Sequence, residues 1–557
     1  MDSYIAMDLL AFACALTAAA FMAWQHPEHQ QTQRMAWVFL ILLLLPILIQ
    51  LLWLDLRNPW KAVQMAMYIS SAWLVFRMAQ GYAAELLEKQ SWFILLAIMG
   101  NAYALFATLV TFVPQPDFVA SLFPIWTGQG ARFGGVFMQA NMQSLFLSII
   151  CIGLWARAIS TERYIPWLLA SLLPCAGVFA TSSRSSALVL LIGVLALLFL
   201  CQQRKVASIK LLVVIALAFG LSEYWLSFAQ HMPGYDHNLL QRFESSGTQA
   251  RLFIWDMVWR LFIEQPWFGI GAGNLISYGT EGQIATLAAH PEWSSIADGF
   301  SGGHAWAHNL VLQFFCEWGI FGGLAITGLV IGVFYRAWRI LFIYKTELTS
   351  GSAQAAFGAT LMLMHGMVSI SMMQGFFLAL FALYAAALFP VSQRQTCSKQ
   401  STTAQHKAQY LLLLLLPAVF MFYQWQLFIN KELAIERVIN LPVKSEAFIA
   451  GASEAITSPW SARPALQLYF SSLLAEHAKP GILIGSENFA YRFWFLHQSS
   501  LSLRYLILIA HLKDDVLSEQ RLINTYRLAY PALFQRSPLA RHTAARHQQG
   551  ESIDLNN

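Results

Sequence analysis

The sequence predicts an all-α protein that crosses a membrane about twelve times. Hydrophobic residues form 57% of the 557-residue chain and charged residues only 11%, and the mean hydropathy is +0.52. Soluble domains carry about 25% charged residues. Apolar runs long enough to form membrane-spanning helices recur along the whole chain. The predicted spans are residues 4–24, 36–56, 63–82, 92–113, 135–155, 164–181, 186–202, 209–229, 309–335, 353–370, 372–390 and 409–428.

Basic residues in three short loops predict the orientation, because short cytoplasmic loops are enriched in Lys and Arg. The first of these loops carries its basic residues without any acid. Alternation then places residues 230–307 and the tail on the opposite side. The 230–307 loop agrees, with three arginines against seven acidic residues. The basic residues are Arg204, Lys205 and Lys210, then Arg336, Arg339 and Lys345, then Arg394, Lys399 and Lys407.

This topology divides the chain into four regions. Residues 1–229 hold the N-terminal spans, 230–307 form a large non-cytoplasmic loop, 308–428 hold the C-terminal spans, and 429–557 form a helical non-cytoplasmic tail. The tail has short amphipathic patterns around 463–477, 500–512 and 516–530, and a disordered composition from about residue 536. In the loop, an apolar stripe at helical spacing suits a helix on the membrane surface. Its members are Leu252, Trp255, Trp259 and Phe262.

Charge and cysteine content exclude other classes. A formal charge of +5 is small for this length and does not indicate nucleic-acid binding. None of the six cysteines falls in the two large extramembrane regions, so neither a disulfide framework nor a zinc ribbon is expected.

His308 is the first candidate for chemistry, because it lies where the long loop re-enters an apolar run. A neutral imidazole at that boundary suits a general base, and a structural boundary histidine is the alternative. His304 lies four residues earlier, as in a helical metal pair. The glutamate of a zinc-hydrolase helix is missing, with Ala305 in its place, so a metal site is disfavoured.

Arginines on the same predicted face form the second candidate set. Arg184 lies in a polar stretch, Thr181 to Ser186, between two apolar runs, where a charge is costly without an anion. Guanidinium groups bind pyrophosphate oxygens in pairs. The alternative for each arginine is a salt bridge, with Asp256 or Glu244 as the partner. The remaining arginines of the set are Arg132, Arg242 and Arg251.

Side-chain amides and one further histidine complete the candidates. Gln139, Asn141 and Gln143 lie at the mouth of a predicted span and either join neighbouring helices or orient a phosphate or sugar. The glycine-rich residues 269–273 follow no predicted strand, so a tight turn is expected there rather than a dinucleotide site. His365 lies inside a span, and we predict a packing role for it.

Several short elements occur in a defined order along residues 125–390. They are Gly128-Gln129-Gly130, residues 134–141, Ser183-Arg184, Arg251, residues 266–271 (Pro-Trp-Phe-Gly-Ile-Gly), residues 308–313 (His-Asn-Leu-Val-Leu-Gln) and residues 317–322 (Glu-Trp-Gly-Ile-Phe-Gly). This order resembles the O-antigen ligase superfamily of bacterial inner membranes. The Gly-Gln-Gly element, Gln139 with Asn141, and the long tail are similar to the PglL-like protein O-oligosaccharyltransferases, including the pilin-glycosylating branch.

The resemblance implies a GT-C-like glycosyltransferase of the inner membrane with its active site facing the periplasm. It implies an undecaprenyl-pyrophosphate-linked oligosaccharide as donor, a Ser or Thr hydroxyl of a periplasmic protein such as type IV pilin as acceptor, and neither metal nor cofactor. His308 would be the base. Arg184, Arg251 and Arg132 would bind the pyrophosphate, and Gln139, Asn141 and Asn309 would orient donor or acceptor.

Two departures from the family pattern affect the acceptor. Where relatives have His-Ser-His-Asn, this chain has Trp306-Ala307-His308-Asn309, and residues 369–373 replace an acidic Glu-Tyr-Pro element. A narrow acceptor range is therefore expected. The alternatives are O-antigen ligation to lipid A-core or polymerisation of repeat units and, remotely, a transporter of lipid-linked glycan. Inverted repeats and paired intramembrane acids, which are typical of transporters, are not found in the sequence.

Overall fold

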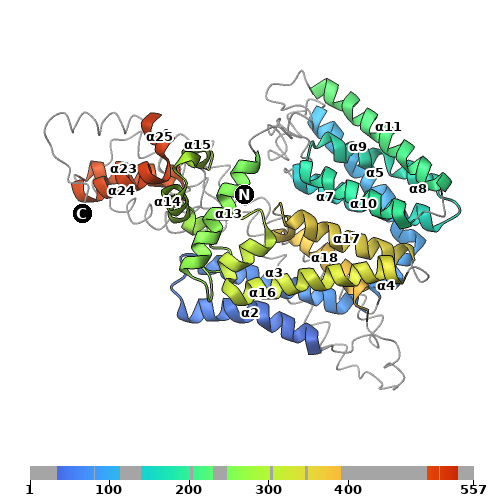
Figure 1. Cartoon of the computed structure of the whole chain (residues 1–557), viewed down its shortest axis with the longest axis horizontal. Coiled ribbons are helices and arrows are strands. Elements are labelled where there is room, and N and C mark those ends of the chain that lie inside the picture. Colours follow the sequence, from blue (N-terminus) through green and yellow to red (C-terminus); the bar gives the residue numbers. More distant parts are fainter. Residues whose placement is uncertain are drawn as a thin grey trace, which may run out of the picture.

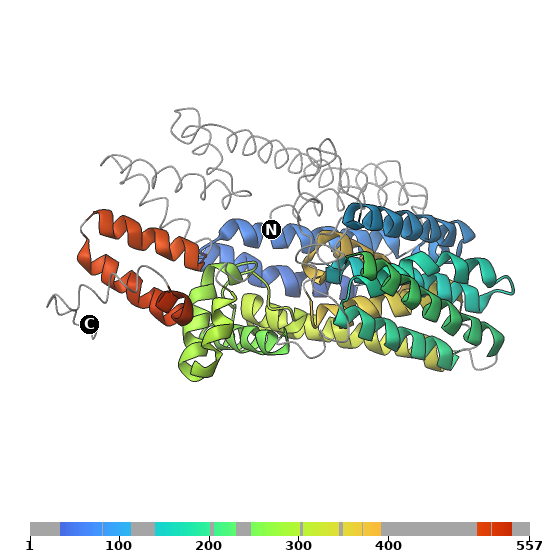
Figure 2. The same cartoon turned by 90° about the horizontal axis from the view of Figure 1, so that it is seen from above.

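The computed structural model describes residues 34–80, 82–112, 140–200, 205–229, 247–300, 305–344, 349–369, 371–390, 498–513 and 515–536. Every regular element within these residues is a helix, so the all-α prediction is confirmed. Figures 1 and 2 show a long helical bundle that adjoins a smaller unit at one end. The predicted spans 4–24 and 409–428 and the predicted helix at 463–477 lie outside the described residues.

The bundle contains the apolar helices, and we call the smaller part the loop–tail unit. The bundle helices are α2 (Arg34–Trp53), α3 (Pro59–Ala79), α4 (Ala83–Glu88), α5 (Gln90–Phe112), α7 (Ala140–Ser160), α8 (Ile165–Ala170), α9 (Leu172–Ala180), α10 (Arg184–Leu200), α11 (Lys205–Ala229), α16 (Leu310–Trp338), η5 (Arg339–Ile343), α17 (Ser350–Gly366), η7 (Ser371–Met373) and α18 (Gly375–Leu388). The loop–tail unit contains α13 (Gly247–Glu264), η3 (Leu275–Tyr278), α14 (Gly279–Ala289), η4 (Pro291–Trp293), α15 (Ser294–Asp298), α23 (Ser500–Leu512), α24 (Val516–Ala529) and α25 (Pro531–Arg536).

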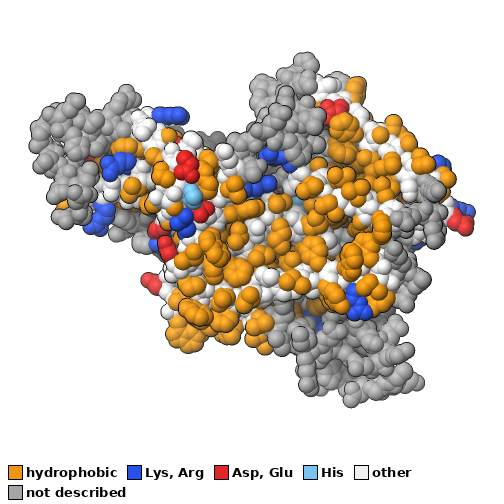
Figure 3. Space-filling model, viewed as in Figure 1, with side chains coloured by type: hydrophobic (Ala, Val, Ile, Leu, Met, Phe, Trp, Pro, Cys, Tyr) orange, Lys and Arg blue, Asp and Glu red, His pale blue; other side chains and the backbone are white. Residues whose placement is uncertain are grey.

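Four segments within the described residues are long and apolar enough to cross a membrane: Gln90–Thr108, Ala140–Ser160, Val206–Ser227 and Leu310–Ile343. Shorter apolar helices of the same bundle include α10 and α18. Figure 3 shows hydrophobic side chains over most of one face of the bundle, whereas charged side chains gather over the loop–tail unit. A membrane protein is therefore supported, while the number of crossings stays a prediction.

The run predicted as one span at 164–181 folds as two short helices, α8 and α9. Pro174 has no N–H to donate to the carbonyl four residues earlier, which belongs to Ala170. The Asn101 side chain takes that place and donates to the Ala170 carbonyl at 2.7 Å. At the junction, the Ser171 hydroxyl accepts a hydrogen bond from the Trp155 indole at 2.8 Å. A side chain from another helix, Asn101, thus satisfies the carbonyl that Pro174 leaves without its usual donor.

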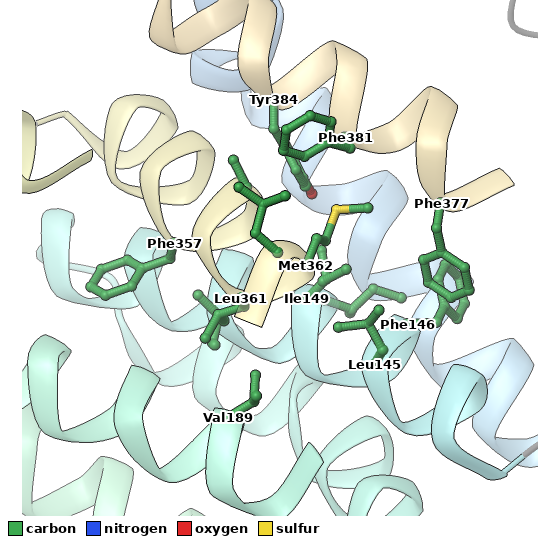
Figure 4. Close-up of a cluster of buried hydrophobic side chains, with 14 of the residues drawn as sticks. Leu145, Phe146, Ile149, Val189, Phe357, Leu361, Met362, Phe377, Phe381 and Tyr384 are labelled. Atoms are coloured by element: carbon green, nitrogen blue, oxygen red, sulfur yellow. The ribbon is translucent and has the colours of Figure 1, made fainter. Parts of the chain in front are cut away.

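Helix α17 lies in the centre of the bundle between α7, α10 and α18 (Figure 4). Its sequence is apolar on nearly all sides, as expected for a helix without a solvent face. Leu361 and Met362 are almost completely buried. This packing fixes the end of α17, where His365 lies, against the beginning of α10.

The loop and the tail, which are far apart in sequence, share one core. Leu503, Ile507 and Tyr526 of the tail helices form a buried cluster, against which Ile284 of α14 packs. The backbone N–H of Gln498 donates to the Ile276 carbonyl at 3.1 Å. The predicted helices at 500–512 and 516–530 are confirmed as α23 and α24.

Helix α13 divides its apolar residues between two faces. Phe253, Met257 and Leu261 are buried in the core of the loop–tail unit, whereas Leu252 and Trp259 of the predicted surface stripe are each 46% exposed. The other two stripe members, Trp255 and Phe262, are partly buried. In Figure 1, α13 runs across the direction of α2 and α16. It therefore presents an exposed apolar edge beside the bundle.

A glycine-rich loop is held in a break of α16. Gly319 has φ 68° and ψ −163° inside that helix, a conformation that is essentially restricted to glycine. The break frees backbone groups for the loop: Ile270 N–H donates to the Cys316 carbonyl at 2.9 Å, and Ile320 N–H donates to the Pro266 carbonyl at 2.8 Å. The two sequence elements at 266–271 and 317–322 are therefore two halves of one contact.

Two buried polar side chains complete this contact. The Glu317 carboxylate accepts from the backbone N–H groups of Gly273, at 2.9 Å, and Leu275, at 3.1 Å. Gln50 of α2 donates to the Glu317 carbonyl at 2.7 Å and accepts from the Ala272 N–H at 3.0 Å. The expected tight turn at 269–273 is confirmed by the positive φ angles of its three glycines. Buried polar groups that are satisfied in this way specify one arrangement of the loop against the bundle.

Candidate functional site

His308 lies in the short connection between the loop–tail unit and α16, in a left-handed backbone conformation with φ 52°. Non-glycine residues rarely adopt this conformation, which costs on the order of 1–3 kcal/mol. The next residue, Asn309, is the N-cap of α16, and its side chain accepts from the Leu312 N–H at 3.1 Å. On the other side, the Ala307 carbonyl accepts from the Trp255 indole at 3.1 Å. His308 is thus strained between two anchored neighbours.

Arg251 interacts electrostatically with His308 and also with Arg184, and so links the three side chains. Arg251 is on α13, one helical turn before Trp255, and Arg184 is the first residue of α10. Burial and, secondarily, the positive charge of Arg184 lower the pKa of Arg251. Among the described residues, neither guanidinium forms an ion pair with a carboxylate. Adjacent positive charges in a partly buried site favour binding of an anion.

The salt-bridge alternative for Arg251 is not found with Asp256. Asp256 pairs instead with Arg260 on the same helix, at 2.5 Å and 3.2 Å. The other partner considered, Glu244, lies outside the described residues.

Burial and a neighbouring positive charge lower the basicity of His308. Burial and then the charge of Arg251 lower its pKa from 6.5 to about 4. The imidazole is therefore neutral at pH 7 and has a lone pair that can accept a proton. An anion bound between the arginine and the histidine would offset the positive charge of the arginine and would raise this pKa.

Next to Arg184 lies a buried cluster of hydroxyl groups in the turn between α9 and α10. Ser182 has φ 49°, and the Ser183 hydroxyl donates to the Asn141 side-chain oxygen at 2.8 Å. The hydroxyls of Ser185 and Ser186 lie 3.4 Å and 3.2 Å from Nε2 of His365. The turn that carries Arg184 is therefore fixed from both sides, by α7 and by α17.

The structure brings Arg184, Arg251 and His308 together, with Asn141 joined to the Arg184 turn. Asn309 belongs to the same connection, where its side-chain oxygen caps α16. Arg132 and Gln139, as well as Arg242 and His304, lie outside the described residues. Among the residues described, no three His, Cys, Asp or Glu side chains gather in a way that could hold a metal ion.

His365 belongs to this cluster, although the sequence predicts a packing role for it. Its side chain is fully buried, and it contacts the two hydroxyls and interacts electrostatically with Arg251. The signal was present in the sequence, because a titratable residue inside a span is costly and functional by default.

Comparison with known families bears on this arrangement. A sequence model described as O-antigen ligase matches residues 169–327. This region belongs to the O-antigen ligase superfamily. The O-antigen ligase region extends from the end of α8 into α16, and therefore contains Arg184, Arg251 and His308. A comparison with curated proteins found no match.

The O-antigen ligase match confirms the predicted superfamily and supports glycosyl transfer from a lipid-linked oligosaccharide in a membrane setting. The matched region ends within α16, so His365 lies beyond it. Geometry therefore adds a fourth side chain, from α17, to the three that the O-antigen ligase region holds.

Proposed function

We propose that this protein is an inner-membrane O-oligosaccharyltransferase. It moves a glycan from undecaprenyl-pyrophosphate to a Ser or Thr hydroxyl of a periplasmic protein, with type IV pilin as the acceptor. The observation that carries the proposal is that Arg251 interacts electrostatically with both His308 and Arg184, all three inside the matched ligase region. These three residues lie 67 and 57 positions apart in the sequence (251 − 184 and 308 − 251).

The chemistry requires one bond to break and one to form. The bond between the anomeric carbon and the pyrophosphate oxygen breaks, and the electron pair leaves with the lipid pyrophosphate. The acceptor hydroxyl oxygen bonds to the anomeric carbon, and its proton passes to the imidazole of His308. Arg184 and Arg251 bind the leaving pyrophosphate and stabilise the negative charge that develops on it. The leaving group is already a stable anion, so this step needs no general acid.

Binding of the donor would prepare His308 for that step. In the free site its pKa is about 4, so it is a weak base. The negative pyrophosphate would offset the charge of Arg251 and thereby raise the pKa of His308 toward the ordinary value. The site thus gains a stronger base when the donor is present.

The hydroxyl cluster would keep Arg184 in place during this reaction. Ser183 joins the Arg184 turn to Asn141, and Ser186 joins it to His365. Arg132 and Gln139 remain proposed members, for pyrophosphate binding and donor orientation.

Intact pilin mass tests the proposal in cells that carry the wild-type protein, a deletion, and His308→Ala. Loss of a glycan-sized mass in both altered strains, at normal protein level, supports a pilin ligase that uses His308. If the glycan-sized mass is lost only in the deletion strain, the protein is still the pilin ligase, but His308 is not its base.

O-antigen ligation to lipid A-core is the second candidate, because the matching family model is described as O-antigen ligase. It predicts unchanged pilin mass in the deletion strain. The lipopolysaccharide of that strain would lose its long-chain bands on a gel. One pair of measurements on the same cells therefore separates the two acceptors.

A further inference from the structure

We infer that Trp255 and Gln313 are positioning residues for His308: they bind the two ends of the Ala307 residue and thereby keep the His308 ring in its place beside Arg251. The Trp255 indole donates to the Ala307 carbonyl at 3.1 Å, and the Gln313 side-chain oxygen accepts from the Ala307 N–H. Neither residue was among the candidates for chemistry in the sequence. The catalytic meaning of this inference rests on the proposed function, and its geometric part does not.

The strain at His308 gives these bonds their importance. With φ 52°, the backbone would lose this strain by returning to an ordinary conformation. That rotation would carry the side chain to another direction. Ala307 is completely buried, and a residue that is hydrogen-bonded at both N–H and C=O cannot rotate without leaving those groups unsatisfied.

The two positioning residues come from the two elements that meet at the site. Trp255 lies four residues after Arg251 on α13, so one helix presents the arginine and the indole on neighbouring turns of the same face. Gln313 lies in the first turns of α16 and is almost completely buried. Its backbone N–H donates to the Asn309 carbonyl at 2.9 Å. Ala307 therefore links the helix that carries Arg251 to the helix that follows His308.

The charged and titratable groups around His308 make its pKa a measure of where the ring lies. Arg251 on α13 acts on it directly, and Arg184 on α10 and His365 on α17 each interact with Arg251. These groups affect the pKa of His308 only while the ring is held beside Arg251. If the ring leaves that place for water, its pKa rises toward 6.5. A general loss of stability would not produce such a rise in a folded sample.

The experiment follows His308 by NMR in the full-length protein in detergent, labelled with ¹³C at Cε1 of histidine. The His308 signal is assigned by its loss in His308→Asn. Trp255→Phe keeps an aromatic ring and removes the N–H donor, and Gln313→Met keeps the side-chain length and removes the acceptor. Trp259→Phe is the matched control, because Trp259 lies one turn further along α13 and is 46% exposed.

In wild-type protein and Trp259→Phe, we expect the signal to stay in the neutral form down to pH 5. In Trp255→Phe and Gln313→Met, we expect a midpoint higher by at least one pH unit, a tenfold gain in proton affinity. An unchanged midpoint in a folded variant overturns the inference for that residue, and unchanged midpoints in both variants overturn it as a whole. Size-exclusion elution at the wild-type volume shows whether each variant is folded, and if one is not, the other decides the test.

A kinetic measurement separates this inference from the proposed function. If the protein transfers glycan, Trp255→Phe should lower kcat about three- to tenfold, the effect of losing one hydrogen bond. The KM for the lipid-linked donor should change by less than about twofold, because Arg184 and Arg251 remain. Absence of transfer by the wild-type protein refutes the function and leaves the NMR result valid. A rise in KM without a change in kcat would contradict the positioning role.

Discussion

Gly319→Ala is predicted to cause a specific loss of stability, because it acts on the contact between the 266–271 loop and α16. Gly319 adopts φ 68° within α16, and an alanine there costs about 1–3 kcal/mol in backbone strain. A Cβ at this position would lie 2.2 Å from the Trp267 carbonyl oxygen and 2.6 Å from the Phe268 nitrogen. Ordinary contact begins at 3.4 Å, so the 266–271 loop must move by about 1.2 Å (3.4 − 2.2).

That movement would weaken the two reciprocal hydrogen bonds between the loop and α16, donated by Ile270 and Ile320. A backbone hydrogen bond contributes about 1 kcal/mol net. Together with the strain, the expected loss is about 3–5 kcal/mol. At about 2 °C per kcal/mol for a large chain, the thermal midpoint should fall by roughly 6–10 °C.

The assay is thermal aggregation of detergent-solubilised protein, followed by fluorescence-detected size exclusion. Gly328→Ala and Gly332→Ala are matched controls in the same helix, since a Cβ at either position meets nothing within 4 Å. Their midpoints should equal or slightly exceed that of wild type, because alanine favours a helix over glycine. If Gly319→Ala had the same thermal midpoint as the wild type, the argument that the loop is held in the break of α16 would be refuted.

Three further predictions concern the site and the bundle. Arg251→Lys should lower kcat/KM at least about tenfold at normal protein level, because a lysine lacks the planar pair of N–H donors with which a guanidinium binds two pyrophosphate oxygens side by side; a glycan-transfer assay with purified donor checks this. Inorganic pyrophosphate should raise the pKa of His308 above about 4, and so increase the protonated fraction at pH 5, visible by NMR; an unchanged titration would contradict the anion site. Asn101→Ala should destabilise the bundle by about 1–3 kcal/mol, because the Ala170 carbonyl loses its donor; its midpoint in the same aggregation assay should fall.

The helices could be predicted from the sequence, because a long apolar run in a membrane has few alternatives to a helix. It could not show that residues 164–181 form two helices. Pro174 indicates a weak point there, but the side chain that satisfies the break, Asn101, comes from another helix. Whether a helix can break at a proline depends on whether a neighbouring helix supplies a hydrogen-bond donor for the freed carbonyl. That donor is identified only when the packing of the helices is known.

The candidate site was predicted in part for the same reason. Arg184 and His308 lie beside apolar runs, where a titratable group is costly, and that cost is visible in the sequence; Arg251 was included because it lies on the same predicted face. The way in which each is held is not visible. His308 depends on Ala307 and on Trp255, and the Arg184 turn depends on Asn141 and on the end of α17.

The two glycine-rich elements show a third limit. Residues 269–273 predict a turn, and residues 317–322 read as part of a span. Their relation becomes clear only when Gly319 opens α16 and the loop donates a hydrogen bond to the helix there. Glu317 lies in the run predicted as a span, and both of its oxygens accept hydrogen bonds from the backbone of the loop. It therefore positions the loop from which α14 continues.

The electrostatics of the site explain why a weak base and paired arginines belong together. Two guanidinium groups that can hold a pyrophosphate must, when it is absent, disfavour protonation of any histidine beside them. Burial is the main cause of the lowered pKa of His308, about 4, and the second cause is the charge of Arg251, which would also bind the donor. Under the proposed function, a bound donor would offset the charge of Arg251 and raise the pKa of His308. Such a site would couple activation of the acceptor hydroxyl to occupancy by the donor, because the imidazole would become a stronger base only when an anion occupies the site.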